Sequence, residues 1–276
     1  MWIDAHHHLW QYNESDYVWM TEKMQSLRRD FLAPELISEF EGAGIDGSVA
    51  VQARQSLAET EWLLQIAHSD PLIRGVVGWV PLSDSDIGEH LDRLSHNFAL
   101  RGVRHVLHDE PDDFYMLRED FNRGIDRLSE YGLTYDILIF EHHLPQTIRF
   151  VDRHPNQAFI LDHIAKPRIR EQILSPWKEN IQELAKRPNV YCKLSGVVTE
   201  ADWGSWNQDQ LIPYFDTVLS AFGPNRLMFG SDWPVLTLAS SYQGWTDTVR
   251  SLVAGLSRDE QESISSGSAI AAYHLR

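Results

Sequence analysis

Cysteine is nearly absent from this chain of 276 residues. The single thiol, Cys192, has no partner for an intramolecular disulfide, a pattern that fits a reducing compartment. No uncharged apolar run reaches about 18 residues, the length that a membrane-spanning helix needs. The N-terminus also lacks the charged region and long apolar stretch of a secretory signal. We therefore expect a cytoplasmic protein without a membrane span.

Basic residues are scarce relative to acidic ones. Lys and Arg total 24 against 40 Asp and Glu, so the net charge is −16 with neutral histidines. An acidic surface repels phosphate backbones and anionic lipids, so we expect no binding to nucleic acid or to membranes. The 43% of hydrophobic residues suffice for one large core, and no low-complexity linker divides the chain. We predict a single domain over residues 1–276; oligomeric state is left open.

Short β-branched runs recur along the chain and predict strands. Eight of them begin at Ile3, Ile45, Ile73, Gly102, Leu133, Ala158, Val190 and Leu227. Amphipathic stretches follow several of these runs, at residues 59–67, 89–94, 121–131 and 177–186. Strands and helices that alternate about every 30 residues form βαβ units, which require a parallel sheet.

Eight such units predict a (β/α)₈ TIM barrel, for which about 250 residues are typical. A doubly wound sheet is the alternative, but no Gly-x-Gly-x-x-Gly follows the first strand. Residues 11–34 form a long first loop, and loops of that length often act as a lid or a site wall.

The stretch IDAHHHLW at residues 3–10 brings three histidines to the end of the first predicted strand. Successive strand residues point to opposite faces, so His6 and His8 should share one face and His7 the other. Strands 1 and 8 are neighbours in a closed barrel, so Asp232 should lie near both. His6, His8 and Asp232 can hold one metal ion, although two histidines can equally be hydrogen-bonded core residues.

Polar side chains also follow most other strands, where a parallel barrel collects its active residues. We expect His163 to be catalytic and further residues to contact substrate: Arg54, Arg104, His105, Glu141 and Lys166, with Trp10 and Trp233 as an apolar wall. Structural ion pairs or plain packing are the competing explanations for these residues. We expect His7 and the loop residues His108, His142 and His143 to have little part in the chemistry.

These motifs resemble the amidohydrolase superfamily of (β/α)₈ hydrolases. Beside IDAHHHLW, the stretches VQAR (51–54), RGVRH (101–105), LDHIAKP (161–167), CKLSGVVTEADW (192–203) and MFGSDWPV (228–235) resemble its sugar-lactone hydrolase branch, L-fuconolactonases most of all. The resemblance implies an enzyme of L-fucose degradation that opens an aldonolactone with water. Where many relatives carry a bridging lysine on strand 4 and a histidine on strand 5, this chain has Arg104 or His105 and Glu141, which argues against a two-metal centre.

Lactone hydrolysis needs an activated water and a group that stabilises the developing oxyanion. We assign Asp232 as the base; capping of the following helix is its alternative role. His6, His8 and His163 would surround the carbonyl oxygen, either as donors or through one divalent metal such as Zn²⁺. Two other functions stay open. One is hydrolysis of aromatic lactones or decarboxylation of aromatic acids on the same barrel, and the other is binding of a sugar acid without catalysis.

Overall fold

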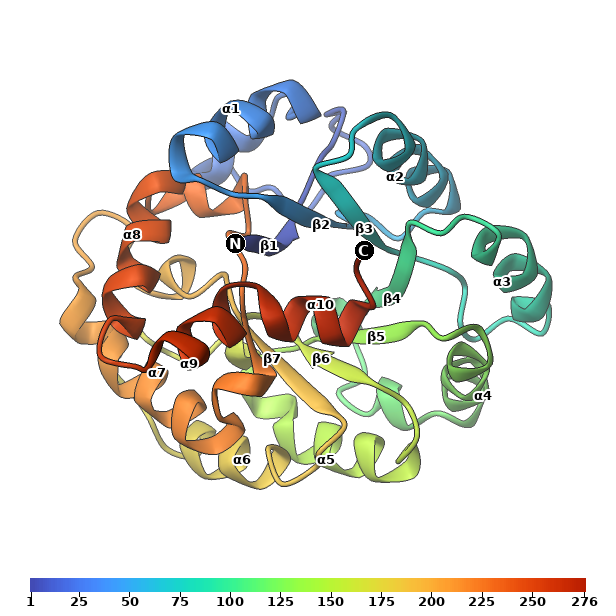
Figure 1. Cartoon of the computed structure of the whole chain (residues 1–276). Helices are drawn as coiled ribbons and strands as arrows, with labels where there is room; N and C mark the ends of the chain where they lie inside the picture. The colour runs from blue at the N-terminus through green and yellow to red at the C-terminus, as the bar shows by residue number, and fades with distance from the viewer.

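The computed structural model describes residues 1–276 and contains one eight-stranded parallel sheet whose strands follow one another in chain order. The strands are β1 (Ile3–His7), β2 (Gly47–Val51), β3 (Ile73–Gly78), β4 (Leu100–Val106), β5 (Thr134–Leu138), β6 (Phe159–Leu161), β7 (Val190–Leu194) and β8 (Leu227–Phe229). All eight predicted strands are present, and the sheet curves into a barrel surrounded by helices (Figure 1). The predicted TIM barrel is confirmed.

Helices cover the outside of the barrel and follow the strands in sequence. They are α1 (Ala33–Ala43), α2 (Leu57–Ser69), α3 (Ile87–Ser95), α4 (Glu119–Leu128), α5 (Leu144–Arg153), α6 (Trp177–Leu184), α7 (Gln208–Phe222), α8 (Tyr242–Val253), α9 (Arg258–Glu262) and α10 (Ser268–Tyr273). The four predicted amphipathic stretches correspond to α2, α3, α4 and α6. No helix is long and apolar enough to cross a membrane.

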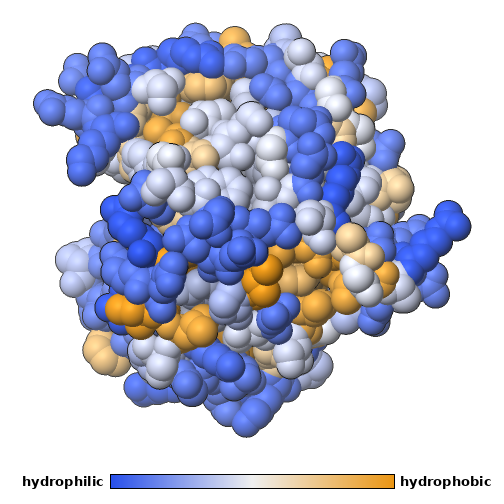
Figure 2. All heavy atoms as spheres, turned by 90° about the vertical axis from the view of Figure 1, so that its left-hand side faces the viewer, coloured by the Kyte–Doolittle hydropathy of each residue, from blue (hydrophilic) through white to orange (hydrophobic).

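Two apolar clusters divide the core between the outside and the inside of the barrel. The larger one, of 63 buried residues, includes buried side chains of the surrounding helices. The smaller one has 11 buried residues from the strands and from the C-terminal segment, among them Ile3, Val77, Met228 and Tyr273. The outer face in Figure 2 is mainly hydrophilic with smaller apolar areas, as expected for helices that bury one face only.

The barrel closes between β8 and β1 through a few hydrogen bonds. The N–H of His8 donates to the carbonyl of Trp233 at 2.6 Å, and the N–H of Asp232 donates to the carbonyl of His6 at 2.7 Å. This closure places the end of β1 beside the segment after β8. The first loop, predicted over residues 11–34, contains a short 3₁₀ helix at Glu22–Leu27 and ends where α1 begins.

Candidate active site

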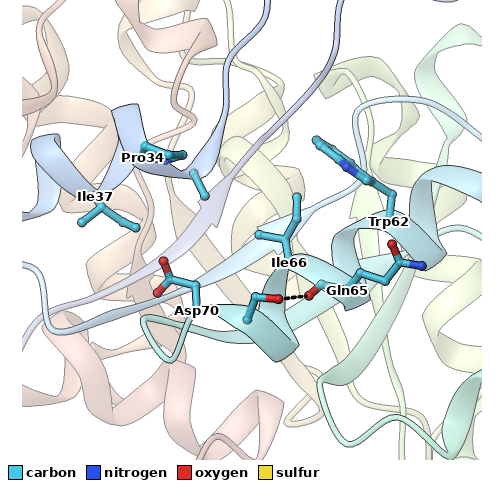
Figure 3. Close-up of a pocket in the computed structure, with 8 residues that line it drawn as sticks. Pro34, Ile37, Trp62, Gln65, Ile66 and Asp70 are labelled. Atoms are coloured by element: carbon cyan, nitrogen blue, oxygen red, sulfur yellow. Dashed lines mark hydrogen bonds between the residues drawn. The ribbon is translucent and has the colours of Figure 1, made fainter.

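A cavity of about 420 Å³ lies at the ends of the strands. Half of its lining is apolar, including Trp19 and Met24 of the first loop, which confirms that this loop forms a site wall. The other residues are polar: His8, Arg104, His108, Asp109, His163, Lys166, Thr199, Glu200 and Asp232. A separate hollow between α1 and α2 on the outside of the barrel carries one charged side chain, Asp70 (Figure 3). The chemistry therefore belongs to the cavity at the barrel mouth.

The side chains of His6 and His8 both point into the barrel, as strand alternation predicts. Their Nε2 atoms are 3.2 Å apart, whereas His7 faces outward, with its Nε2 2.9 Å from the hydroxyl of Ser48. The pairing register with β2 shifts between Asp4 and His7, which indicates a β-bulge. Because of this bulge, Asp4 does not share the inner face with His6, although strict alternation would place it there.

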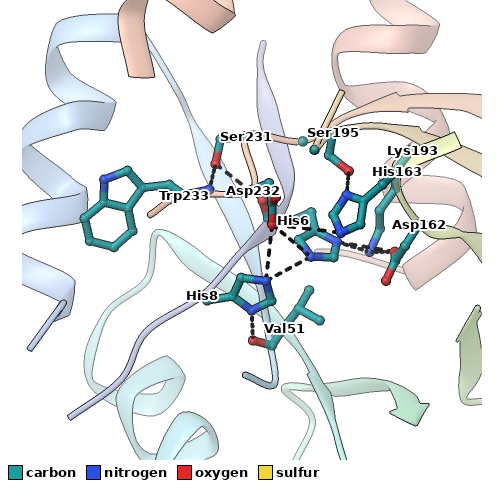
Figure 4. Close-up of polar contacts among 12 residues, drawn as sticks. His6, His8, Val51, Asp162, His163, Lys193, Ser195, Ser231, Asp232 and Trp233 are labelled. Carbon is teal, nitrogen blue, oxygen red and sulfur yellow. Dashed lines mark hydrogen bonds and ion pairs between the residues drawn. The ribbon is translucent and has the colours of Figure 1, made fainter. Parts of the chain in front are cut away.

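Asp232 completes a cluster with three histidines (Figure 4). Its Oδ1 lies 3.4 Å from Nε2 of His8, 3.8 Å from Nε2 of His6 and 3.9 Å from Nε2 of His163. Asp232 has a left-handed backbone conformation with φ 61°, which is uncommon outside glycine. Local strain of this kind is held in place by the surrounding structure and is frequent at functional sites.

Asp4 fixes this strained turn from behind. Its Oδ1 accepts hydrogen bonds from the N–H groups of His6 and Ser231, at 3.0 and 2.8 Å. Its Oδ2 accepts from the hydroxyls of Ser231 and Tyr242, at 2.6 and 2.8 Å. One buried carboxylate therefore ties the strand of the histidines to the segment that carries Asp232.

His163 reaches the cavity from a left-handed turn after β6. Residues His163–Lys166 have φ angles of 52°, 47°, 62° and 47°, a run that costs roughly 1–2 kcal/mol for each residue. The indole N–H of Trp177 donates to the carbonyl of Ile164 at 2.7 Å, and this bond holds the turn. Nδ1 of His163 lies 2.9 Å from the hydroxyl of Ser195, so the ring turns its Nε2 toward Asp232.

A layer of buried charges lies beneath the cluster. Nζ of Lys193 lies 2.6 Å from Oδ2 of Asp136 and 3.0 Å from Oδ1 of Asp162, and Nη1 of Arg104 lies 3.0 Å from Oδ2 of Asp162. Two cations thus balance two carboxylates in a region that excludes water, which is the condition under which buried charges are tolerated. The charges of this layer therefore cancel without a protonated His6.

The protonation states follow from burial and from these neighbours. Burial, with the charge of Lys193 adding to it, holds the pKa of His6 well below its usual value. Burial likewise lowers the pKa of His163 to about 4. Burial acts to raise the pKa of Asp232, but the neighbouring His163, His8 and Lys166 outweigh it and keep the pKa low. At neutral pH the cluster combines an ionised carboxylate with neutral imidazoles at His6 and His163.

His6, His8 and Asp232 fit a divalent metal ion by the chemistry of their donor atoms. Nδ1 of His8 lies 2.8 Å from the carbonyl of Val51, so it carries the proton and leaves a lone pair on Nε2. Nδ1 of His6 has a donor at 3.1 Å in Lys193 and an acceptor at 3.3 Å in Asp162, so either tautomer is supported. Two ligands of a tetrahedral zinc lie roughly 3.3 Å apart, close to the 3.2 Å between the two Nε2 atoms.

Among the residues predicted to contact substrate, Arg104 and Lys166 line the cavity. Arg104 is held by Asp162 and by the carbonyl of Gln52, while Nζ of Lys166 pairs with Oε1 of Glu200 at 3.0 Å. Both cations are therefore anchored by partners and present their charge to the same space.

The other predicted contact residues lie outside the cavity lining, which argues against substrate contact. Trp10 and Trp233 are fully buried and pack on Phe31; in Figure 4 the indole of Trp233 points away from the histidines. Both aromatic rings serve packing because they belong to the apolar layer beneath the first loop.

Three polar residues predicted to contact substrate also lie outside the cavity lining, and each has another partner. His105 alternates with Arg104 along β4, so it faces outward, stacks on Tyr115 and pairs with Glu110. Glu141 lies three residues beyond the end of β5 and pairs with Arg168 at 2.7 Å. Arg54 pairs with Asp16 of the first loop and contributes to the attachment of that loop.

Several residues at the site were not assigned from the sequence. Glu200 and Trp203 line the cavity from the segment after β7, whose direction the sequence pattern does not reveal. His108, expected to have little part in the chemistry, also lines the cavity, from the short 3₁₀ helix after β4. Lys193 and Asp162 lie beneath the cavity. The position of Lys193 inside the apolar run VYCKL could have indicated a buried ion pair. The buried Cys192 packs in the core, as predicted.

Comparison with known proteins agrees with this geometry. Residues 3–275 match the family model described as Amidohydrolase. An L-fucono-1,5-lactonase from Burkholderia multivorans is 40% identical over 288 residues, covering 99% of this chain and 96% of the relative. Another from Burkholderia ambifaria is 35% identical and covers 87% and 82%. A crystal structure of an amidohydrolase from Burkholderia multivorans with bound zinc has a TM-score of 0.96 at 39% identity over the full length of both chains.

The match over nearly the full chain confirms the resemblance to this superfamily and to L-fuconolactonases. This chain is an enzyme of the amidohydrolase family.

Proposed function

We propose that this enzyme hydrolyses the ring ester of a sugar lactone, with L-fucono-1,5-lactone as its substrate. The observation that carries the proposal is the convergence of the ionised Asp232 with three histidines in a cavity that is half polar. We choose this substrate because two relatives of the chain are named L-fucono-1,5-lactonase.

In the proposed reaction Asp232 accepts a proton from the attacking water. Its Oδ1 makes the three contacts with histidine nitrogens, and we assign the proton transfer to Oδ2. The water adds to the lactone carbonyl, the ring C–O bond then breaks, and the alkoxide leaving group takes up a proton. Asp232 can return the proton it accepted, so no outside acid is required.

The developing oxyanion needs donors or positive charge close by, and the cavity lining offers both. His163 and Arg104 lie at the cavity surface with polar nitrogen atoms. A divalent ion held by His6, His8 and Asp232 would polarise the lactone carbonyl as a Lewis acid. Removal of metal by a chelator decides whether such an ion is required.

Lys166 and Glu200 are the proposed contacts for the sugar hydroxyls. A hydroxyl both donates and accepts, so an ammonium beside a carboxylate can bind two adjacent hydroxyls. The apolar wall of Trp19, Met24 and Trp203 suits the C–H face of a sugar ring.

The experiment is a pH-indicator assay of the purified protein on a panel of lactones, with and without prior chelation. The panel contains L-fucono-1,5-lactone, other aldonolactones and aromatic lactones, each corrected for spontaneous opening. We expect rapid acid release from L-fucono-1,5-lactone. Activity that persists after chelation would assign the chemistry to Asp232 and the histidines alone. Activity that is lost on chelation and restored by zinc would assign a role to a metal ion. Turnover of aromatic lactones alone, or none at all, would overturn the proposal.

A further inference from the structure

The helix α10 lies across one end of the barrel (Figure 1). Its Tyr273 is 1% exposed and packs in the inner apolar cluster with Ile3, Val77 and Met228. The hydroxyl of Tyr273 donates a hydrogen bond of 2.6 Å to Oδ2 of Asp136. A side chain from near the C-terminus of the chain thus reaches into the barrel and contacts a carboxylate on β5.

From Asp136 a continuous series of buried polar contacts leads to the active-site cluster. Oδ2 of Asp136 also accepts from Nζ of Lys193 at 2.6 Å. Lys193 lies 3.0 Å from Oδ1 of Asp162, and the same oxygen lies 3.3 Å from Nδ1 of His6. The side chains of His6, Asp136, Asp162 and Lys193 are all 0% exposed, so no water competes for these contacts.

We propose that Tyr273 is a positioning residue, which acts through Asp136, Lys193 and Asp162 to orient His6 for the proposed lactone hydrolysis. Lys193 lies between two carboxylates, and its distance from each depends on the other donors that each carboxylate binds. The hydroxyl of Tyr273 is a second donor to the same oxygen of Asp136 that accepts from Lys193. Without it, Asp136 draws Lys193 closer, and Lys193 withdraws from Asp162 and from Nδ1 of His6, 3.1 Å away.

Other properties of Tyr273 agree with a fixed donor role. Burial raises the pKa of Tyr273 well above its usual value, so the hydroxyl keeps its proton at neutral pH. The ring also lies 5.4 Å from Nζ of Lys193, within cation–π range. Phenylalanine preserves that ring contact, so Tyr273→Phe removes the hydrogen bond alone.

The test compares Tyr273→Phe with Leu275→Ala. Leu275 is 8% exposed and belongs to the same apolar cluster, but it has no polar link to His6. Loss of a residue that orients an active-site histidine typically lowers activity by about 10–100-fold. We expect Tyr273→Phe to lower kcat on L-fucono-1,5-lactone by this factor with KM within about twofold. We expect Leu275→Ala to lower Tm and leave kcat unchanged.

A second readout does not depend on the substrate. In protein with labelled histidines, the imidazole NMR signal of His6, assigned with His6→Gln, should shift in Tyr273→Phe and stay in place in Leu275→Ala. If the wild type opens no sugar lactone, the proposed function fails while this signal still tests the role of Tyr273. Should Tyr273→Phe fail to fold, Asp136→Asn replaces it: this variant frees Lys193 to move toward Asp162 and His6, the opposite direction, and should likewise shift the His6 signal and lower kcat. An unchanged His6 signal, or an equal loss of kcat in both variants, would overturn the proposal.

Discussion

Gly196 packs directly against the imidazole ring of His163. A Cβ at position 196 would lie 2.5 Å from Nδ1 of His163 and 3.1 Å from Oδ2 of Asp232. The backbone of Gly196 also has φ 59°, in the left-handed region that favours glycine. The space beside His163 therefore exists because this position lacks a side chain.

Gly196→Ala should displace His163 and lower kcat/KM by roughly 100-fold, the loss expected when one stabilising group is removed. Gly132→Ala is the matched control, because Gly132 has φ 65° and a Cβ added there would meet no atom within 4 Å. Both variants place alanine at a similar positive φ, but only the side chain at position 196 meets His163. Steady-state kinetics on L-fucono-1,5-lactone with thermal melts measures both effects, and equal activity losses would contradict the assignment.

Glu59 makes stability depend on pH. It is 2% exposed, and its Oε2 accepts from the N–H groups of Ala53 and Arg54 at 3.0 Å each. Burial raises its pKa from 4.5 to about 7. A carboxyl with a raised folded-state pKa favours folding below its unfolded pKa, and this contribution is lost as the pH rises through the folded pKa.

Glu59→Gln should therefore change the pH dependence of folding. The free energy of unfolding of the wild type, relative to the variant, should fall by about 3 kcal/mol between pH 4.5 and pH 8, at about 1.4 kcal/mol for each pKa unit. Urea unfolding at the two pH values measures this difference. Parallel stability curves for the two proteins would show that Glu59 titrates normally.

Glu200 should determine affinity for hydroxylated substrates. Glu200→Gln keeps the shape of the side chain and removes the charge that pairs with Lys166. Loss of a hydrogen bond to a charged group corresponds to a KM increase of roughly 10-fold or more on L-fucono-1,5-lactone. The KM for δ-valerolactone, which has no hydroxyl groups, should stay the same. An equal change for both lactones would assign Glu200 a structural role.

Zinc should stabilise the folded protein through the buried cluster. We expect Zn²⁺ to raise the Tm of the chelator-treated wild type, because a metal that binds only the folded state stabilises it. The shift should disappear in His8→Asn. It should persist in His142→Asn, which disrupts the separate surface group of Asp113, His142 and His143. A shift lost in His142→Asn and kept in His8→Asn would place the metal on the surface.

The order of the strands and the main cluster could be predicted because both depend on simple rules. Eight apolar runs give eight strands, and the barrel brings His6, His8 and Asp232 together. Strand alternation correctly predicted that His7 faces the opposite side of the strand from His6 and His8. These features follow from the chain pattern without knowledge of side-chain packing.

The rest of the site depends on backbone details that the pattern does not encode. The bulge in β1 turns Asp4 away from the inner face, and the left-handed turn after β6 carries both His163 and Lys166 to the cavity. Glu141 lies outside the cavity lining, in the segment beyond β5, where strand alternation no longer sets the direction of its side chain. The sequence marks which residues lie near the barrel mouth but not the direction in which each loop side chain points.

The most direct test of the account is the turnover of L-fucono-1,5-lactone by the wild type and by Asp232→Asn. Asn has the same shape but cannot accept the proton from water. The account predicts acid release by the wild type and a decrease of at least about 10²–10³ in kcat in the variant, with an unchanged circular dichroism spectrum. Near-normal turnover by folded Asp232→Asn would contradict the central role of this carboxylate.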